Sequence, residues 1–494
     1  MPDSTTPPTL PDASMLRPGA GPLPLVVAGR PTTAGQIVEV PSPASPNGGR
    51  SAVHADARIV ANAAAAAESA CKTCAALSRR ARAQILRGAA GYLGEHADDL
   101  AVSLTLEVGK SLRDSRGEVQ RCIATLEAAA DAVAELGGRE IPVDAVPVGA
   151  GRLAFTVWEP VGVVAAITGF NFPLLLAVHK IAAAVGAGCP VLLKPSERTP
   201  FTSVVLADAV VSNGWPAEAI SVLNGGPDVA VALCEDPLVR LVSFTGSSAI
   251  GAKIAERAGR HLKRVVLELG SNAATIVEPD ADLELAARTC ATGGMAATGQ
   301  SCISVQRVLA QSSIAADLAQ RIGAEVAALP TGDPLDPETV VGTLVAPTEL
   351  RRVADLVQDA TAHGAEVVTG GVVDGELRPT VLLGVREPAR LCHEEAFGPV
   401  VAVMPYDDLD EAIALANSTP YGLMTGVFTA SIDTALRVAR GVESGGVHIN
   451  DSSNFRADNM PYGGVKASGL GKEGPASAMR EMSVEKVITV RLPA

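Results

Sequence analysis

Residues 161–195 read VGVVAAITGFNFPLLLAVHKIAAAVGAGCPVLLKP, and this stretch decides the fold class of the chain. An apolar run rich in Val and Ala ends at a turn around Gly169, and a helix-forming segment, 173–188, follows it. A second apolar run, 189–195, comes directly afterwards. Two apolar runs joined by a helix predict neighbouring parallel strands with a crossover helix, the repeating unit of an α/β sheet.

The same alternation continues towards the C-terminus. Apolar runs at 219–225, 238–246, 264–270 and 273–279 extend a parallel, doubly wound sheet with helices on both faces. A second alternating block starts near Asp280. We therefore expect an α/β protein with one α/β domain formed by 23–145 and 164–279, a second α/β domain formed by 280–450, a small β element formed by 146–163 and 480–494, and a disordered Pro-, Ser- and Thr-rich tail, 1–22.

Composition excludes several classes of protein. The formal charge is −14 and no Lys/Arg-rich run occurs, which argues against a nucleic-acid partner bound through its phosphates. No apolar run reaches the roughly 20 residues of a membrane helix, and the first residues do not resemble a signal peptide. We expect a cytoplasmic protein without a membrane partner, in which thiols stay reduced. Cys71 and Cys74 resemble half a zinc site, but no second pair matches them and both fall on an expected helix, so no metal is predicted.

Polar residues follow four of the expected strands where each strand ends. Asn171 stands in the GFNFP turn, Lys194 and Glu197 in KPSERTP, the turn 246–248 in FTGSS, and Glu268 at the end of LELG. Each has an ordinary explanation as a turn, a cap or a solvated charge. Because open α/β sheets bind ligands at the carboxyl ends of their strands, the four together indicate a binding site. The Gly-Ser turn before a helix offers backbone N–H groups to a nucleotide phosphate.

Cys302, in ATGQSCISVQ, completes the set. Taken alone, a cysteine between small residues is as compatible with core packing as with a nucleophile. Beside Glu268 as a general base and Asn171 as a donor to a developing oxyanion, a nucleophile in the second domain becomes the better interpretation.

Seven motifs in this order resemble the NAD(P)-dependent aldehyde dehydrogenase superfamily, from about residue 24 to the C-terminus. They are EPVGVVAAITGFNFPLLLAVHK, GCPVLLKPSERTP, SFTGSSAIG, LELGSNA, GQSCIS, EEAFGPV and MPYGGVKASGLGKEG. The resemblance implies an aldehyde dehydrogenase-like fold, with 23–145 and 164–279 as a Rossmann-type NAD-binding domain and 280–450 as the catalytic domain. It also implies that 146–163 and 480–494 are oligomerisation strands in a homodimer or homotetramer. The terminal strand EKVITVRL would otherwise be an exposed edge, and its partner is either the run RLAFTVWEP or another subunit.

The resemblance implies roles for individual residues. Cys302 is the expected nucleophile, Glu268 the base that activates the hydrolytic water, and Asn171 the oxyanion donor, while Lys180 and Glu473 match polar positions of a proton relay. The expected cofactor-binding residues are Thr168, Phe170, Lys194, Ser196, Glu197, Gly226, Phe244, Gly246, Ser247, Leu269, Gly270, Glu395 and Phe397. The implied reaction oxidises a small aldehyde to its acid through a thiohemiacetal and a thioester. A carboxylate such as Glu197 hydrogen-bonds a ribose 2′-hydroxyl and repels a 2′-phosphate, so NAD is favoured, with NADP possible.

The substrate is less closely defined by the sequence. The motifs around Asn171, Cys302 and HINDSSNFRADNMPYGGVKASG are most similar to the lactaldehyde dehydrogenase-like group, which includes enzymes for small polar aldehydes and phosphonoaldehydes. His179, Ser301 and Arg121 are candidate substrate-pocket residues, and Arg456 is a further loop candidate. Ser301 stands where the resembling phosphonoacetaldehyde enzymes carry Arg, which weakens an anionic substrate. Arg121 also fits a solvated helix face, and His179 a hydrogen-bonded wall.

Two alternatives share the fold. A CoA-acylating dehydrogenase would pass the thioester to CoA and would not need the base Glu268. A catalytically silent binding or structural protein would have no chemical need for Cys302, Glu268 and Asn171 together.

Overall fold

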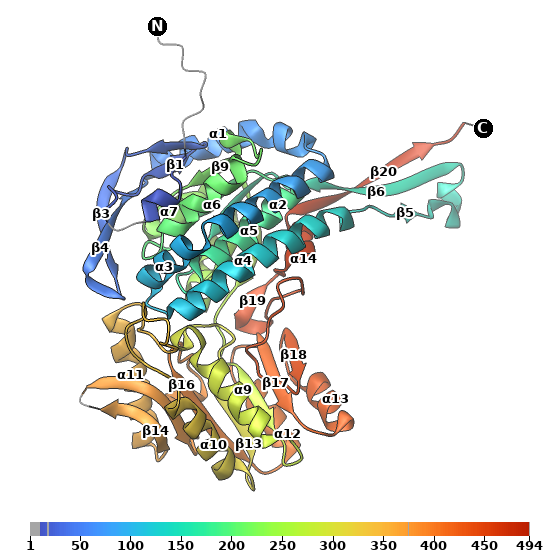
Figure 1. Ribbon diagram of the computed structural model, residues 1–494. Helices are drawn as coiled ribbons and strands as arrows, with labels where there is room; N and C mark the ends of the chain where they lie inside the picture. The colour runs from blue at the N-terminus through green and yellow to red at the C-terminus, as the bar shows by residue number, and fades with distance from the viewer. Residues whose placement is uncertain (1–9, 17–18, 374, 494) are drawn as a thin grey trace.

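The computed structural model describes residues 10–16, 19–373 and 375–493. Two α/β lobes lie one above the other, and a β arm extends from the side of the first lobe (Figure 1). The expected α/β class and the two-sheet organisation are confirmed.

The first lobe is built on an eight-stranded sheet in the order β19-β11-β10-β7-β8-β9-β1-β2. Its strands are β1 (Leu25–Val27), β2 (Arg30–Thr32), β7 (Val163–Ile167), β8 (Val191–Lys194), β9 (Ile220–Val222), β10 (Val239–Thr245), β11 (Arg264–Glu268) and β19 (Gly469–Leu470). The central five, β7 to β11, are parallel, and the strands at both edges are antiparallel to their neighbours. The carboxyl ends of β7, β8, β10 and β11 therefore meet at one edge of this sheet.

Helices cover both faces of this sheet. They are α1 (Ala57–Ala76), α2 (Arg79–Glu95), α3 (Ala97–Val108), α4 (Leu112–Ala132), α5 (Pro173–Ala187), α6 (Phe201–Val211), α7 (Pro227–Glu235) and α8 (Ser248–Arg260). Val164 and Ala166 of β7 pack into the core of α2, α4, α5 and α6, while Val163 and Ala165 pack into the core of α1, α7 and α8. This alternation explains why β7 is apolar along its whole length, because both of its faces are buried.

The second lobe has a seven-stranded sheet in the order β14-β15-β16-β13-β12-β17-β18. Its strands are β12 (Ala274–Val277), β13 (Arg307–Gln311), β14 (Glu366–Val373), β15 (Glu376–Leu383), β16 (Val400–Tyr406), β17 (Met424–Phe428) and β18 (Gly446–Ile449), and its helices are α9 (Leu283–Met295), α10 (Ala315–Ala327), α11 (Pro347–Ala362), α12 (Leu409–Asn417) and α13 (Ile432–Gly441).

The arm is a three-stranded sheet of β5 (Glu140–Ile141), β6 (Arg152–Pro160) and β20 (Ser483–Arg491). β20 pairs with β6 along its full length, from Ser483 opposite Pro160 to Arg491 opposite Arg152. Of the two partners considered for the terminal strand, the structure therefore selects the RLAFTVWEP strand of the same chain. The remaining elements are the hairpin β3 (Gln36–Ser42) and β4 (Ser45–His54) and the helix α14 (Pro475–Glu481).

Two expected boundaries are wrong. The run 273–279 was assigned to the first domain, but β12 pairs with β13 and β17 in the second sheet. The chain crosses between the lobes directly after Glu268, with no helix to signal the change. The C-terminal part, which the expected domains left unassigned between 450 and 480, returns to the first lobe through β19 and α14.

The expected tail, 1–22, is also only partly described, since 1–9 and 17–18 lie outside the described residues. For residues 10–16 the prediction of disorder is wrong. Leu10, Ala13 and Leu16 are buried in the core of the first lobe, so three apolar side chains hold this polar-looking segment in place. Among the helices that the structure describes, none is long and apolar enough to cross a membrane.

Candidate active site

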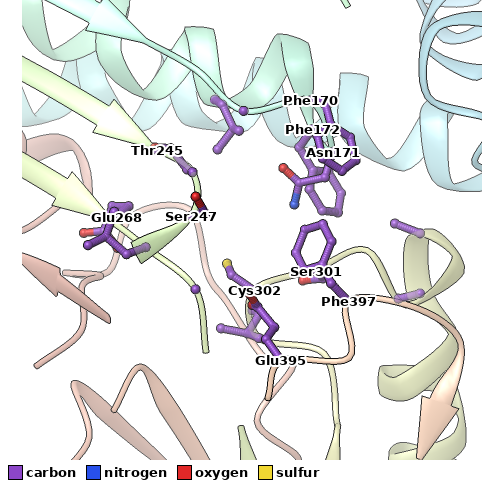
Figure 2. Close-up of a pocket in the computed structure, with 18 of the residues that line it drawn as sticks. Phe170, Asn171, Phe172, Thr245, Ser247, Glu268, Ser301, Cys302, Glu395 and Phe397 are labelled. Atoms are coloured by element: carbon purple, nitrogen blue, oxygen red, sulfur yellow. The ribbon is translucent and has the colours of Figure 1, made fainter. Parts of the chain in front are cut away.

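A cavity of about 1140 Å³ lies between the lobes. Its wall is formed by the loops that follow β7, β10 and β11 in the first lobe, and by the segment around Cys302 and the loop before β16 in the second. The sequence-predicted residues that line it are Arg121, Phe170, Asn171, Gly246, Ser247, Glu268, Leu269, Gly270, Ser301, Cys302, Glu395, Phe397 and Arg456. In the view of Figure 2, Cys302 lies between Glu268 on one side and the Asn171 loop on the other.

The loop between β7 and α5 carries Asn171. Its backbone carbonyl accepts a hydrogen bond from Nζ of Lys110 at 3.1 Å, and the Lys110 ammonium lies 4.3 Å from the ring centroid of Phe172. Lys110 also forms an ion pair with Glu118, and both side chains are fully buried. The other carboxylate oxygen of Glu118 accepts from the backbone N–H of Leu175 at 2.9 Å, in the first turn of α5. One buried ion pair therefore fixes the end of the loop that carries Asn171 and the first turn of α5.

The segment before Cys302 has a strained backbone. Ala297 and Thr298 have φ values of +50° and +59°, in the left-handed region that residues other than glycine avoid. The carboxylate of Asp114, on α4, accepts a hydrogen bond from Ala297 N at 2.8 Å. Gly299 packs so tightly that a Cβ atom would come within 2.1 Å of the Gly398 carbonyl oxygen. The segment is thus held from α4 on one side and from the loop before β16 on the other.

These two loops also contact each other. Nδ2 of Asn171 donates a hydrogen bond to the Gln300 carbonyl at 2.9 Å, across the boundary between the lobes. The Asn171 amide thus directs its N–H groups towards the segment that carries Cys302.

The Cys302 thiol contacts a residue that the sequence did not single out. Its Sγ lies 3.1 Å from Oη of Tyr462, on the loop between β18 and β19. Burial raises the pKa of the Cys302 thiol to about 11, and the Tyr462 hydroxyl and the Arg456 charge oppose this shift.

Glu268 ends β11 with its carboxyl group buried. Neither carboxyl oxygen has a hydrogen-bond partner among the residues that the structure describes. Oε1 points towards Gly463, where an added Cβ would be 2.8 Å away. Burial and the neighbouring Glu473 raise the pKa of Glu268 well above its ordinary value. A raised pKa means that more of this carboxyl group stays protonated at a given pH than in an ordinary glutamate, and that the group becomes a base as the pH rises.

Lys180 and Glu473 form a buried network below Glu268. Nζ of Lys180 is 3.0 Å from Oε1 of Glu473 and donates to the hydroxyls of Ser243 and Thr245. Arg456 lies 3.3 Å from the other Glu473 oxygen. Although burial opposes ionisation, Lys180, His179 and Arg456 hold the pKa of Glu473 well below its usual range. Glu473 is therefore a carboxylate shared by two cations.

Two aromatic rings and a carboxyl group form the opposite wall. Phe170 and Phe397 meet edge to face with their ring centroids 5.8 Å apart. Glu395 accepts a hydrogen bond from Ser271 N at 2.8 Å, and burial raises its pKa to about 7. The guanidinium of Arg352, on α11, donates to the carbonyls of Glu395 and Ala396 and so positions this loop.

Several expected cofactor residues are not in the cavity wall, among them Lys194, Ser196 and Glu197 at and after the end of β8. Lys194 is buried and Glu197 exposed, and at Gly226 an added Cβ would be 3.1 Å from Oδ1 of Asp228 and 3.5 Å from Oε2 of Glu197. Burial lowers the pKa of Lys194 to about 8, against the attraction of both carboxylates. Asp228 was not predicted from the sequence, because an acid in the first turn of a helix is ordinary capping chemistry.

The turn before α8 consists of Gly246 and Ser247, and Ser247 makes no side-chain hydrogen bond that caps the helix among the described residues. Gly246 N donates to the Glu268 carbonyl at 3.0 Å, and the Phe244 ring lies 2.5 Å from where a Gly246 Cβ would be. Thr168 is buried beneath the cavity, and Ser196 closes its own turn by accepting from Arg198 N. A Gly270 Cβ would meet the Glu395 carboxyl at 2.5 Å, so the wall is closed without a side chain there.

The three candidates for the substrate pocket lie in different surroundings. Ser301 lines the cavity beside Cys302. Arg121 also lines it, but its guanidinium pairs with Asp458 at 2.8 Å. His179 is not among the described residues that line the cavity, so its expected place there is wrong. It is buried on α5, one residue before Lys180. Burial lowers its pKa well below the ordinary value. The residues of α5 that reach the cavity are Leu175 and Leu176.

Tyr462 and three residues in and just before α4 were not predicted, because their sequence signals are weak. Tyr462 lies within the motif MPYGGVK, where its ring looked like one more apolar position. Lys110, Asp114 and Glu118 follow one another at four-residue spacing, which an exposed helix face also shows. Their burial, and hence their role, depends on tertiary packing. No cluster of metal ligands occurs within the described part of the chain, where Cys71 and Cys74 lie on α1.

Known proteins resemble this chain in both sequence and structure. The model of the aldehyde dehydrogenase family matches residues 31–488. The 3-sulfolactaldehyde dehydrogenase of Priestia aryabhattai is 42% identical over 83% of this chain and 86% of its own length. The lactaldehyde dehydrogenase of Methanocaldococcus jannaschii is 39% identical over 83% and 88%. The structure of an NAD-dependent aldehyde dehydrogenase from Sinorhizobium meliloti superposes with a TM-score of 0.92, at 34% identity, over 100% of this chain and 98% of its own.

Proposed function

Because this chain belongs to the aldehyde dehydrogenase family, which oxidises aldehydes to carboxylic acids with NAD(P), we propose that Cys302 is its nucleophile, Asn171 its oxyanion donor and Glu268 its hydrolytic base. The observation that carries the assignment is that all three line one cavity and come from both lobes. Three groups of complementary chemistry that converge from distant parts of the sequence are hard to explain by packing alone.

The Cys302 thiolate attacks the aldehyde carbon and forms a thiohemiacetal. The new oxyanion accepts hydrogen bonds from Asn171 Nδ2 and from the backbone N–H of Cys302. Asn171 is already directed to the nucleophile segment by its contact with Gln300. Lys110 and Glu118 restrict the movement of this loop, which lowers the cost of orienting the donor.

Glu268 then serves the second half of the reaction. The thioester must be hydrolysed, and a carboxylate base takes a proton from the attacking water. Because burial raises the pKa of Glu268, the group accepts that proton more readily than an ordinary carboxylate. The charges of Glu473, Arg456 and Lys180 adjust this pKa.

The residues present fit a dinucleotide. Gly246 and Ser247 leave the α8 N-terminus open to phosphate, and Lys194 and Glu197 would hold the adenosine ribose. Glu395 would bind the nicotinamide ribose, with Phe170 and Phe397 beside the ring. Bound NAD supplies the acceptor for the hydride that leaves the thiohemiacetal carbon. NAD is favoured over NADP, since Glu197 and Asp228 would repel a 2′-phosphate.

We further propose a short polar aldehyde as the substrate. Beside the cavity, two buried cations, Lys180 and Arg456, both pair with the carboxylate of Glu473. Polar and charged side chains this close to the nucleophile suit a substrate that carries a hydroxyl or another polar group near the aldehyde. Relatives named for lactaldehyde and 3-sulfolactaldehyde support the proposal.

A panel assay tests the function directly. Purified protein with NAD would receive lactaldehyde, sulfolactaldehyde, phosphonoacetaldehyde and an aromatic aldehyde while NADH absorbance is followed. We expect acid formation without CoA and no turnover by Cys302→Ala. A strict need for CoA would favour the acylating alternative, and inactivity with every aldehyde would favour a silent protein.

We also propose that the protein is a homodimer or homotetramer. β20 has a free edge, and its Val484, Val487 and Val490 are exposed. A long apolar edge strand on a projecting arm is usually covered in nature. A single monomeric mass in light scattering would contradict this. The cytoplasmic location stays a prediction from the sequence.

A further inference from the structure

The contact between Tyr462 and Cys302 joins a side chain outside the assigned catalytic set to the reacting sulfur. Oη and Sγ are 3.1 Å apart, and Tyr462 is 2% exposed. Tyr462 Oη is the hydrogen-bond partner that the described residues supply to this sulfur. The Tyr462 backbone is fixed by two hydrogen bonds with Glu473, at 3.0 Å and 2.7 Å. The hydroxyl is therefore held in place before any substrate arrives.

The chemistry of the two groups decides which one donates. Burial and the neighbouring thiol raise the pKa of Tyr462 well above its ordinary value, so the phenol keeps its proton. A thiolate can only accept. When Cys302 ionises, the S–H bond breaks and its proton passes to a water in the cavity, and the Tyr462 O–H bond then points at the sulfur.

Arg456 strengthens this donor. The centre of its guanidinium lies 3.7 Å from the centroid of the Tyr462 ring, in cation–π geometry. A positive charge over the ring draws electron density from the phenol and makes its hydroxyl a better donor. Tyr462 thus lies between a buried cation and the nucleophile.

The other groups around the sulfur make such help necessary. Burial, Glu395 and Glu268 all oppose ionisation of Cys302, whereas Tyr462 and Arg456 favour it. In the described part of the chain, no histidine hydrogen-bonds the thiol, so no imidazole is placed to act as its base.

We propose that Tyr462 is a catalytic residue: its hydroxyl donates a hydrogen bond to Cys302 Sγ and, with Arg456 stacked on its ring, stabilises the thiolate that attacks the aldehyde. This inference rests on the proposed role of Cys302 as the nucleophile. The competing explanation is packing, because Tyr462 also belongs to a small apolar cluster with Ile303, Leu423 and Met424.

Tyr462→Phe separates the two explanations, since it keeps the ring, the cluster and the Arg456 stacking and removes only the hydroxyl. The assay is the rate of iodoacetamide alkylation of Cys302 in the full-length protein, located by peptide mass spectrometry; below the thiol pKa this rate is proportional to the thiolate fraction. We expect the thiol pKa to rise by about one unit, which slows alkylation at pH 7 about tenfold. The first burst of NADH with a good aldehyde should slow in parallel.

Tyr92→Phe is the matched control. It removes a hydroxyl that bonds to Asp208 at 2.7 Å, far from the cavity in the sequence and not part of its wall, and should leave the Cys302 pKa unchanged. Arg456→Lys provides a second variant, because it keeps a charge and loses the planar stacking, and a smaller rise is expected.

An unshifted thiol pKa in Tyr462→Phe, with a melting temperature equal to that of the wild type, would overturn the inference. If Tyr462→Phe fails to fold, Arg456→Lys decides: an unchanged pKa there also overturns it. Full turnover by Cys302→Ala would instead overturn the proposed function, so the two failures are distinguishable.

Discussion

Asp114→Ala tests whether α4 positions the nucleophile. The carboxylate of Asp114 accepts a hydrogen bond from Ala297 N at 2.8 Å, on the strained segment that leads to Cys302.

 The Asp114 side chain is half-buried in the first turn of α4 and lines the cavity, so Asp114→Ala changes one residue of the cavity wall.

The magnitude follows from the contacts. A left-handed residue other than glycine costs roughly 1–2 kcal/mol, and Ala297 and Thr298 are two in succession. A hydrogen bond to a charged group contributes about 1.5–3 kcal/mol, which is comparable to that strain. Without it the segment relaxes, and each 1.4 kcal/mol reduces the competent population tenfold. We therefore expect kcat/KM and the Cys302 alkylation rate to fall about 10- to 100-fold in Asp114→Ala.

Asp114→Asn separates the hydrogen bond from the charge, because an amide oxygen can still accept from Ala297 N. We expect it to retain activity within about tenfold of the wild type. Arg116→Ala is the control on the same helix, since its exposed side chain is 3.6 Å from the exposed Asp98, and it should change neither rate. Wild-type alkylation and kcat/KM in Asp114→Ala would refute the reasoning.

Four further outcomes are expected. Lys110→Met leaves the buried carboxylate of Glu118 without its partner and should lower the free energy of unfolding by about 3–5 kcal/mol in urea melts. Adding Glu118→Leu should restore part of that free energy. An unchanged free energy of unfolding in Lys110→Met would contradict a buried charge left unpaired. Glu268→Gln should release about one NADH per active site and then stall, because the thioester is no longer hydrolysed. The steady-state rate of the wild type should rise with pH as the raised pKa of Glu268 is crossed, because only the ionised form is a base. A rate that falls across that range would exclude this role. Glu197→Gln should raise the kcat/KM ratio of NADP to NAD about tenfold, and an unchanged ratio would leave selectivity to other groups. Val487→Glu on β20 should shift light scattering towards a smaller assembly, and an unchanged mass would show that this part of the arm lies outside the interface.

Particular residues show how far the sequence can be followed. β7, α5 and β8 were predictable because each is mostly apolar and bounded by a glycine or proline, so local preference and burial agree. β12 was assigned to the wrong sheet because its apolar run follows directly after that of β11 and resembles it. Only the pairing of β12 with β13 and β17 distinguishes the two strands. His179 was a pocket candidate because the resembling family has a tunnel-lining residue at this position, but Leu175 and Leu176, and not His179, are the residues of α5 that line the cavity.

The sequence by itself determined the α/β class, the strand ends that carry Asn171 and Glu268, and the family of the chain, because these depend on motifs and patterns that can be read along the sequence. Only the tertiary structure decided which buried charges meet. Lys180, Glu473 and Arg456 share one network, and Tyr462 contacts the nucleophile from 160 positions away. Side-chain contacts of this range arise from the packing of two lobes, and burial then sets the pKa values on which the chemistry depends.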